Sequence, residues 1–270
     1  MKKLFYIVIS ALLFAVACEQ PAPEENPSQP QVDPTLVYSF DNFAGHEAVV
    51  VKPAEIASNA PVVVVLTDDL ELKTRLSVEP SIDVNFKAAE HCLVGGYTLC
   101  VVGAADGDDI AFLNEVKAKF VDASKLYLLS YCNGLAYTAA MVMPEAFAAY
   151  GCVSGTIDVK TYKTHGFTKP VSFVHVHATK NSVFKWNGVA NKSASVSLSV
   201  GAIVAINECL VFDTTELLQR EGKGLVSCTH YTKSLSGCDV KLYTVESTSN
   251  GWCDEEFEVY NQVWNFFKTH

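Results

Sequence analysis

The sequence has no excess of basic side chains: 20 Lys and Arg stand against 30 Asp and Glu, which gives a formal net charge of −10. A protein that binds DNA or RNA needs a basic face, so this composition argues against a nucleic-acid partner. Glycine, with 15 residues, and proline, with 10, are not enriched, so the bulk of the chain is neither collagen-like nor disordered. No internal repeat is visible, and no second transmembrane stretch follows the N-terminal apolar run.

Cysteine, by contrast, is abundant, with nine residues in a chain of 270. A chain of this length fits one large domain or two small ones. It buries enough apolar surface to fold without a disulfide scaffold. The cysteines therefore call for an explanation other than a disulfide-stapled fold.

The first residues have the composition of an export signal. Lys2 and Lys3 precede an apolar run over residues 4–17, which is too short to span a bilayer as a helix. The small residues just before Cys18 resemble the cleavage site of a bacterial lipoprotein signal, in which the cysteine is lipidated and becomes the new N-terminus. The alternative is an ordinary secretory signal in which Cys18 is incidental. We expect residues 1–17 to be removed and Cys18 to anchor the protein to the outer membrane.

Residues 18–36 are expected to form a tether between this anchor and a domain over residues 37–270. Half of the prolines of the chain lie in this segment, interleaved with acidic residues. Such a segment has little to bury and prefers an extended backbone. Acidic residues soon after the cysteine also resemble the surface-export signals of Bacteroides-like bacteria, which would place the domain at the cell surface.

Beyond residue 36, apolar runs alternate with helical patterns. The runs that predict buried parallel strands are 62–66, 97–102, 125–129, 171–177 and 240–245. Two helices are predicted from apolar residues at helical spacing: Ile110, Leu113, Val116 and Phe120 after Asp108 and Asp109, and Phe257, Tyr260, Trp264 and Phe267 near the end. Because each parallel strand needs a crossover helix, this order predicts one α/β domain with a mostly parallel central sheet flanked by helices.

The turn after the third predicted strand carries the most chemical information. Residues 130–134, Ser-Tyr-Cys-Asn-Gly, lie between Leu128-Leu129 and a helix of small residues over 135–140. This is the strand-turn-helix context of a nucleophile elbow, a strained turn that needs small residues beside the nucleophile. Ser130 and Gly134 meet that need, and Cys132 occupies the nucleophile's place.

Residues 108–113, 126–134 and 144–149 resemble the polyhydroxybutyrate depolymerase and feruloyl esterase group of α/β hydrolases. Three further blocks support the resemblance in the same order: residues 61–66, residues 175–179 with Asn187-Gly188, and residues 240–246 with Trp252. The similarity covers roughly residues 48–270. It implies an α/β-hydrolase fold.

The resemblance also implies where a catalytic triad would lie, and each of its positions is altered. The serine of the family is Cys132, the aspartate that follows the His-Gly-Thr block is Asn181, and the histidine base is Asn250. The His-Gly pair whose backbone helps line the oxyanion site reads Thr67-Asp68. Every catalytic position that the resemblance would transfer has changed.

These changes remove the groups that move protons. Asparagine cannot accept a proton at position 250, and loss of a general base typically lowers a rate by about 10² to 10⁴. A thiol with a pKa of about 8.5 is only slightly ionised at neutral pH, so Cys132 needs a neighbouring base or positive charge. If Asp68 points inward, its carboxylate opposes the developing oxyanion. We therefore expect an inactive site.

Another histidine could act as the general base for Cys132 if it lay within hydrogen-bonding distance. His175 and His177 lie near the end of a predicted central strand, where catalytic groups gather in such folds. The competing interpretation is structural, because relatives also have a histidine at the position of His177, and His175 is expected to face a helix. A metal site at this pair is disfavoured, since no further ligands follow at suitable spacing, and no cofactor is expected.

The other cysteines divide into two groups. Cys100 and Cys152 fall on apolar segments and are expected to be buried. In an exported protein a disulfide is plausible, and we expect one among Cys209, Cys228, Cys238 and Cys253, whose pairing the sequence does not settle. Of the seven cysteines other than Cys18 and Cys132, only Cys92 has no predicted role.

The sequence thus predicts an exported, membrane-anchored esterase-like protein that binds a ligand without catalysis. The expected ligand is a small molecule, a carbohydrate or an ester. The residues expected to line its site are Thr67, Asp68, Asn133, His177, Trp186 and Trp252, although either tryptophan equally suits core packing. The alternative is a weak carboxylic-ester hydrolase or thioesterase with Cys132 as nucleophile, and the third interpretation is a structural or protein-binding role.

Overall fold

The computed structural model describes residues 36–67, 88–105, 107, 109–217, 221–249, 253 and 257–270, with the backbone alone at 88–90. The chain divides into two compact units, Met1–Gln31 and Val32–His270, and all of the described elements belong to the second. Cys18, Asp68, Asn250 and Trp252 lie outside the described residues. Within the described part of the chain, no helix is long and apolar enough to cross a bilayer.

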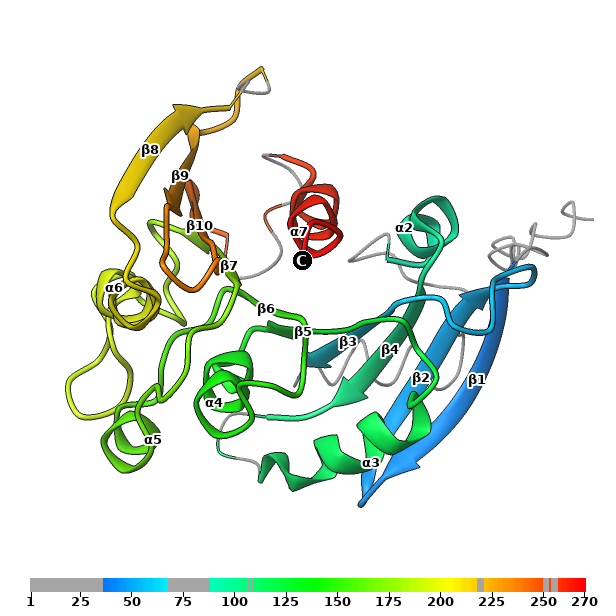
Figure 1. Ribbon diagram of the computed structural model, residues 1–270. Helices are drawn as coiled ribbons and strands as arrows, with labels where there is room; N and C mark the ends of the chain where they lie inside the picture. Colours follow the sequence, from blue (N-terminus) through cyan, green and yellow to red (C-terminus); the bar gives the residue numbers. More distant parts are fainter. Residues whose placement is uncertain are drawn as a thin grey trace, which may run out of the picture. The chain divides into compact units, whose positions relative to one another are not determined.

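A ten-stranded sheet with helices on both faces forms the second unit (Figure 1). In chain order, the elements are β1 (Leu36–Phe43), β2 (His46–Pro53), β3 (Val62–Thr67), α2 (Ala88–Gly95), β4 (Thr98–Gly103), the 3-10 helix η1 (Ile110–Phe112), α3 (Leu113–Lys119), β5 (Leu126–Tyr131), α4 (Leu135–Val142), β6 (Ala149–Val153), α5 (Val159–Thr164), β7 (Phe173–Ala178), α6 (Val196–Asn207), β8 (Val211–Glu216), β9 (Val226–Thr232), β10 (Val240–Val245) and α7 (Val259–Phe267).

Six neighbouring strands of the sheet are parallel. The strand order is β1-β2-β4-β3-β5-β6-β7-β10-β9-β8, and the pairs from β4 through β10 are all parallel. The prediction of a mostly parallel sheet flanked by helices is confirmed, and each of the five predicted runs lies on a strand of this parallel block. Because parallel strands end at the same edge, the loops after β5, β6 and β7 meet there.

The sheet separates two hydrophobic cores. On β3, Val63 and Val65 belong to a core with α2 and α7, whereas Val64 and Leu66 belong to the opposite core with α3, α4 and α6. Figure 1 shows α2 and α7 on one face of the sheet, and α3 and α4 on the other. All six residues of β3 are buried, as a continuous apolar run requires of a strand covered on both faces. A unit with two cores of its own has what it needs to fold alone.

Two antiparallel additions flank the parallel block, and the strands that form them were not among the predicted runs. The β1–β2 hairpin turns at Ala44 and Gly45, both with positive φ, and the β8–β9 ribbon extends the other end beyond β10. All six residues of β8 are exposed. The exposed residues of β1 and β8 interrupt any apolar run of the kind on which the strand prediction rests, whereas β2 contains a buried apolar run over residues 48–51 that was missed.

Both helices predicted from apolar spacing are present. The Asp109 carboxylate accepts a hydrogen bond from Ala111 N at 2.9 Å and caps η1, which continues into α3 with Leu113 and Val116 buried. At the end of the chain, α7 covers the sheet with Tyr260 and Phe267, whereas Phe257 precedes the helix. Asp108 lies outside the described residues.

Candidate functional site

Cys132 stands on a strained turn between β5 and α4. Its φ of 55° is in the left-handed region, which costs a non-glycine residue about 1–3 kcal/mol unless the surroundings impose it. Its backbone N–H donates to Val153 O on β6 at 3.0 Å, which fixes the turn to the neighbouring strand. The side chain is half-buried and packs against the core on the α2/α7 face. The predicted elbow geometry is therefore present around a cysteine.

Close packing beneath the turn explains why small residues surround it. Ser130 is fully buried, and its hydroxyl donates to Asn133 O at 3.0 Å. A Cβ atom at Gly155 would lie 1.9 Å from the same oxygen, so only glycine fits there. Gly155 follows β6 and was not singled out from the sequence, because its partner is distant along the chain and becomes a neighbour only when β5 and β6 pair.

The Asn133 side chain ties together the ends of three strands. Its amide nitrogen lies 3.1–3.3 Å from three carbonyl oxygens, those of Leu66, Ala104 and Tyr131, and its Oδ1 accepts from Leu135 N at 3.1 Å. The residue is fully buried. Asn133 was predicted to bind a ligand, but the hydrogen-bonding groups of its side chain are engaged by backbone groups of the protein.

The backbone N–H of Asn133 differs from its side chain. Among the described residues it has no hydrogen-bond acceptor, although the residue is buried. It follows Cys132 directly, which is where an α/β hydrolase places an oxyanion donor. Thr67 stands at the end of neighbouring β3, buried, with its carbonyl accepting from Ala104 N at 2.8 Å. One donor suited to a carbonyl oxygen is thus retained beside Cys132.

Asn181, at the position of the family's acid, has a fixed orientation. Its Oδ1 accepts from the backbone N–H groups of Val183, at 3.0 Å, and Phe184, at 2.7 Å. These two donors determine which amide atom is the oxygen. The residue is only 4% exposed, and its Nδ2 has no partner among the described residues. The Asn181 Nδ2 group can only donate a hydrogen bond to a neighbouring side chain, whereas the acid of a triad must accept one.

His175 and His177 belong to a buried hydrogen-bonded chain. Tyr137 Oη lies 2.8 Å from His175 Nδ1, His175 Nε2 lies 3.2 Å from His177 Nδ1, and His177 Nε2 lies 2.7 Å from Phe184 O. A carbonyl only accepts, so His177 Nε2 carries the proton and its Nδ1 accepts from His175. His175 Nδ1 then accepts from the Tyr137 hydroxyl. Every ring nitrogen of the pair is used.

This chain requires both rings to be neutral, and burial enforces that state. Burial lowers the pKa of His175 well below its ordinary value of 6.5, and the adjacent His177 lowers it further. Burial also lowers the pKa of His177, against the opposing effect of its bond to Phe184 O. Burial raises the pKa of Tyr137, which keeps its hydroxyl protonated as the first donor.

The two imidazoles also lie on the face of the sheet away from Cys132. They alternate along β7 with Val174, Val176 and Ala178, which face the α2/α7 core. Their hydrogen bond to Tyr137 of α4 agrees with that side, and it confirms that His175 faces a helix. Neither histidine has a nitrogen available to serve Cys132 as a base.

Trp186 is half-buried and packs edge-on against His177, with ring centroids 6.0 Å apart. It also lies against the α4/α6 core. Its contacts are those of a packing residue, one of the two roles that the sequence left open.

A cavity of about 420 Å³, which we call the edge cavity, opens at the carboxyl end of the parallel strands. Its lining residues are Gly107, Thr156, Asp158, Val183, Phe184, Val189, Lys192 and Ser193. Val183 and Phe184 are also the residues that hold Asn181. No sequence motif joins Thr156 and Asp158, which precede α5, to Lys192, which lies in the connection between β7 and α6.

The described cysteines form no disulfide. Among the four expected to contribute one, Cys209 Sγ lies 3.9 Å from Cys238 O, and Cys228 lies on β9. Cys100 and Cys152 are buried on β4 and β6, as predicted, and burial raises the pKa of Cys100. No group of three or more His, Cys, Asp or Glu side chains in the described part of the chain is arranged to hold a metal ion.

The sequence matches no protein-family model and no curated protein. Solved structures do resemble the fold. An acetyl xylan esterase from Aspergillus awamori is 12% identical, with a TM-score of 0.55 over 86% of this chain and 99% of the esterase. A glucuronoyl esterase from Solibacter usitatus is 11% identical, with a TM-score of 0.48 over 88% of this chain and 87% of its own.

An α/β serine hydrolase homologue from Coxiella burnetii is 10% identical, with a TM-score of 0.44 over 86% of this chain and 96% of its own. At these identities the likeness concerns the fold alone. The likeness to the acetyl xylan esterase, together with the parallel strand order and the elbow after β5, shows that the chain has an esterase-like α/β-hydrolase fold.

Proposed function

We propose that this protein is a non-catalytic member of the α/β-hydrolase fold that binds an ester-type or carbohydrate ligand at the carboxyl edge of its sheet. The observation that carries the proposal is the orientation of Asn181. Its oxygen is held by Val183 N and Phe184 N, and its remaining group is an unpartnered Nδ2 donor. A triad acid stabilises an imidazolium by accepting a hydrogen bond from its Nδ1–H, and an amide N–H donor at the same place opposes that interaction.

The histidines of β7 give a second argument for the lack of catalysis. The ring nitrogens of His175 and His177 are all engaged in the chain from Tyr137 to Phe184 O. Protonating either ring would place two donors against each other or break a buried bond. Neither imidazole is suited to cycle a proton for Cys132.

Two features near Cys132 suit ligand binding and require no proton transfer. The strained backbone of Cys132 is retained, and the N–H of Asn133 lacks an acceptor among the described residues. A ligand carbonyl oxygen beside this N–H would complete its hydrogen bonding. The edge cavity, with Asp158 and Lys192 among its lining residues, offers polar side chains for the remainder of the ligand.

The alternative function is a weak carboxylic-ester hydrolase or thioesterase. The observation that favours it is the half-buried thiol of Cys132 on an elbow turn, next to an oxyanion donor. Thiolates attack esters and thioesters well, but release of the acyl group needs an activated water. Without a base, this path ends after one acyl transfer.

Methyl ferulate, the methyl ester of an aromatic acid, separates the two functions. Residues 32–270 are titrated with it by calorimetry, and the ester is recovered afterwards and analysed by chromatography. The proposal predicts saturable binding with the ester recovered intact, in both the unaltered protein and Cys132→Ala. Release of ferulate that is lost in Cys132→Ala supports the hydrolase instead.

We further propose that the domain is held at the bacterial outer membrane by a lipid on Cys18, on the basis of the signal-like residues 1–17. Metabolic labelling with a fatty acid tests this, with Cys18→Ser as the matched variant. The proposal predicts label on the unaltered chain alone. Equal labelling of both, or of neither, would contradict it.

A further inference from the structure

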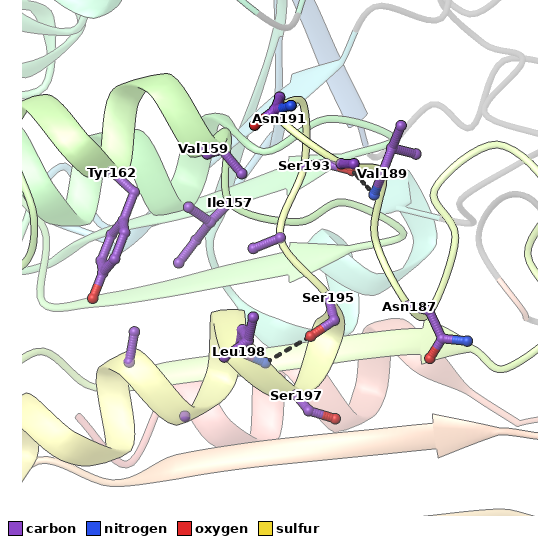
Figure 2. Close-up of a pocket in the computed structure, with 14 residues that line it drawn as sticks. Ile157, Val159, Tyr162, Asn187, Val189, Asn191, Ser193, Ser195, Ser197 and Leu198 are labelled. Carbon is purple, nitrogen blue, oxygen red and sulfur yellow. Dashed lines mark hydrogen bonds between the residues drawn. The ribbon is translucent and has the colours of Figure 1, made fainter.

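A second cavity lies between helices α5 and α6, away from the elbow (Figure 2). We call it the α5–α6 pocket. It has a volume of about 480 Å³, and the elbow residues Cys132 and Asn133 are not among those that line it. Ile157, Ala194 and Ala202 of its lining belong to or pack against the α4/α6 core, whereas Cys132 packs against the core on the other face of the sheet. The pocket is therefore separate from the elbow.

The pocket borders the edge cavity at one turn. Val189 and Ser193 line both, and they are joined by backbone hydrogen bonds of 2.9 and 3.0 Å in the two directions. Asn191 at the tip of this turn has a φ of 59°. The turn over residues 189–193 therefore lies between the two cavities, which share Val189 and Ser193 and otherwise have different lining residues.

The lining of the α5–α6 pocket contains no charged side chain. Its 14 residues are Ile157, Val159, Tyr162, Asn187, Val189, Ala190, Asn191, Ser193, Ala194, Ser195, Ser197, Leu198, Gly201 and Ala202. Most of them are apolar, in a protein with a net charge of −10. Moving an ion into such a site without a partner is unfavourable, so the pocket selects against charged ligands.

Two large apolar side chains line the pocket although they are open to solvent. Leu198 is 68% exposed and Tyr162 is 43% exposed. In Figure 2 they come from the two facing helices, with Tyr162 on α5 and Leu198 on the first turn of α6. A ligand between them would remove both from water, at a gain of about 25 cal/mol per Å² of apolar area buried.

Two serine hydroxyls add polar specificity. Ser195 Oγ accepts from Leu198 N at 3.1 Å, and Ser193 Oγ accepts from Val189 N at 3.1 Å. Neither hydroxyl donates to an acceptor within the described residues. Each therefore retains one O–H proton for an acceptor atom on a ligand.

We propose that the α5–α6 pocket is a binding site for an uncharged, mostly apolar small molecule that carries a carbonyl or ester oxygen. The apolar walls bind its aromatic or acyl part, and Ser193 and Ser195 donate to its oxygen. The volume lies within the range of about 300–1,000 Å³ of ordinary ligand pockets. The site shares Val189 and Ser193 with the edge cavity, but none of its residues belongs to the elbow, so its test does not depend on Cys132.

Gly201 offers a way to fill the pocket without disturbing the fold. A Cβ atom added there has no heavy atom within 4 Å, and the residue lies inside α6 with no positive φ. Leucine favours a helix over glycine by up to about 1 kcal/mol, so Gly201→Leu should fold at least as stably as the unaltered chain. Its side chain would occupy space that the ligand needs.

Nile red, an uncharged aromatic dye with one carbonyl, is the probe for the test. Its fluorescence is titrated with residues 32–270, with Gly201→Leu, and with Ala118→Leu, which adds an exposed leucine to α3 far from the pocket. We expect saturable binding that Gly201→Leu weakens about tenfold or more and Ala118→Leu leaves unchanged. Ser193→Ala should weaken binding severalfold, since it removes one donor.

Two results would overturn the proposal: no saturable binding by the unaltered protein, or the same affinity in Gly201→Leu once thermal unfolding shows that this variant is folded. Cys132→Ala should bind Nile red unchanged. If Cys132→Ala lowers the affinity for Nile red as much as Gly201→Leu does, the dye binds at the elbow and not in the α5–α6 pocket. That result would contradict this proposal but not the proposed function at the elbow.

Discussion

His175 Nε2 donates a hydrogen bond to His177 Nδ1 across 3.2 Å inside the sheet, and the direction of that bond is fixed by Phe184 O at the far end of the chain. The pair joins α4, through Tyr137, to the loop that holds Asn181. Two histidines near the carboxyl end of a central strand invite a catalytic interpretation. Here they are a neutral, fully bonded connection between the elbow helix and the neighbouring loop.

Breaking this chain should destabilise the fold. His177→Ala removes the donor to Phe184 O and the acceptor for His175, and it leaves buried polar groups unpaired. We expect a loss of about 2–4 kcal/mol in the free energy of unfolding, measured by urea titration. His165→Ala, at an exposed position, should stay within about 0.5 kcal/mol of the unaltered protein. An equally small change at His177 would show that the chain contributes little.

Stability should fall as the pH drops below the ordinary histidine pKa of 6.5. The folded-state pKa values of His175 and His177 are lowered by burial, so the unfolded state binds more protons in this range. The free energy of unfolding then decreases with falling pH by at most about 3 kcal/mol per pH unit if both groups act fully. His270, whose pKa is also lowered, contributes in the same direction.

Urea titrations at several pH values from about 7.5 down to 5.5 measure this slope. In His175→Gln the slope should be smaller, because one titrating group is gone. A slope that is unchanged in this variant would assign the pH dependence to other groups.

Asn133 should be among the least replaceable residues of the elbow. Asn133→Ala removes the amide that contacts Leu66 O, Ala104 O and Tyr131 O, and leaves buried carbonyls without a donor. We expect a loss of about 2–4 kcal/mol in the free energy of unfolding. Asn114→Ala, on the exposed face of α3, is the matched control and should change stability by less than about 0.5 kcal/mol.

The proposal that Cys132, Asn181 and Asn250 replace a catalytic triad can be tested by restoring the catalytic residue types. Asn181→Asp preserves an oxygen for Val183 N and Phe184 N and replaces the unpartnered donor with an acceptor. Combined with Cys132→Ser and Asn250→His, it should produce measurable hydrolysis of an aryl acetate if the Asn133 N–H acts as an oxyanion donor. The variant without Asn181→Asp is the control and should be slower. If the triple variant gains no activity, we infer that Thr67-Asp68 also prevents catalysis at the oxyanion site.

The sequence predicted the parallel block of the fold well, because its strands are buried on both faces and appear as continuous apolar runs. It missed β1, β2, β8 and β9, the antiparallel strands outside this block, and it gave no bounds for β6 (Ala149–Val153), although it predicted an apolar segment around Cys152. It also located the elbow, since a strained turn between a buried strand and a small-residue helix has a local signature.

The site was less predictable, because its contacts join residues that are far apart along the chain. Gly155 packs on Asn133, and Phe184 O terminates the chain that begins at Tyr137. The position of Asn181 followed from the resemblance, but which of its amide atoms is occupied depends on two backbone N–H groups that only the fold brings to it. The lining of the α5–α6 pocket likewise comes from two helices and a loop without any motif.

Counting the turnovers of an activated ester shows whether Cys132 catalyses hydrolysis. Residues 32–270 are mixed with excess 4-nitrophenyl acetate, and the nitrophenolate released per protein molecule is compared with that of Cys132→Ala. The account predicts that Cys132 releases at most about one equivalent, because a thiol accepts the acyl group but no base activates water to remove it. Sustained release of many equivalents, abolished in Cys132→Ala, would contradict it.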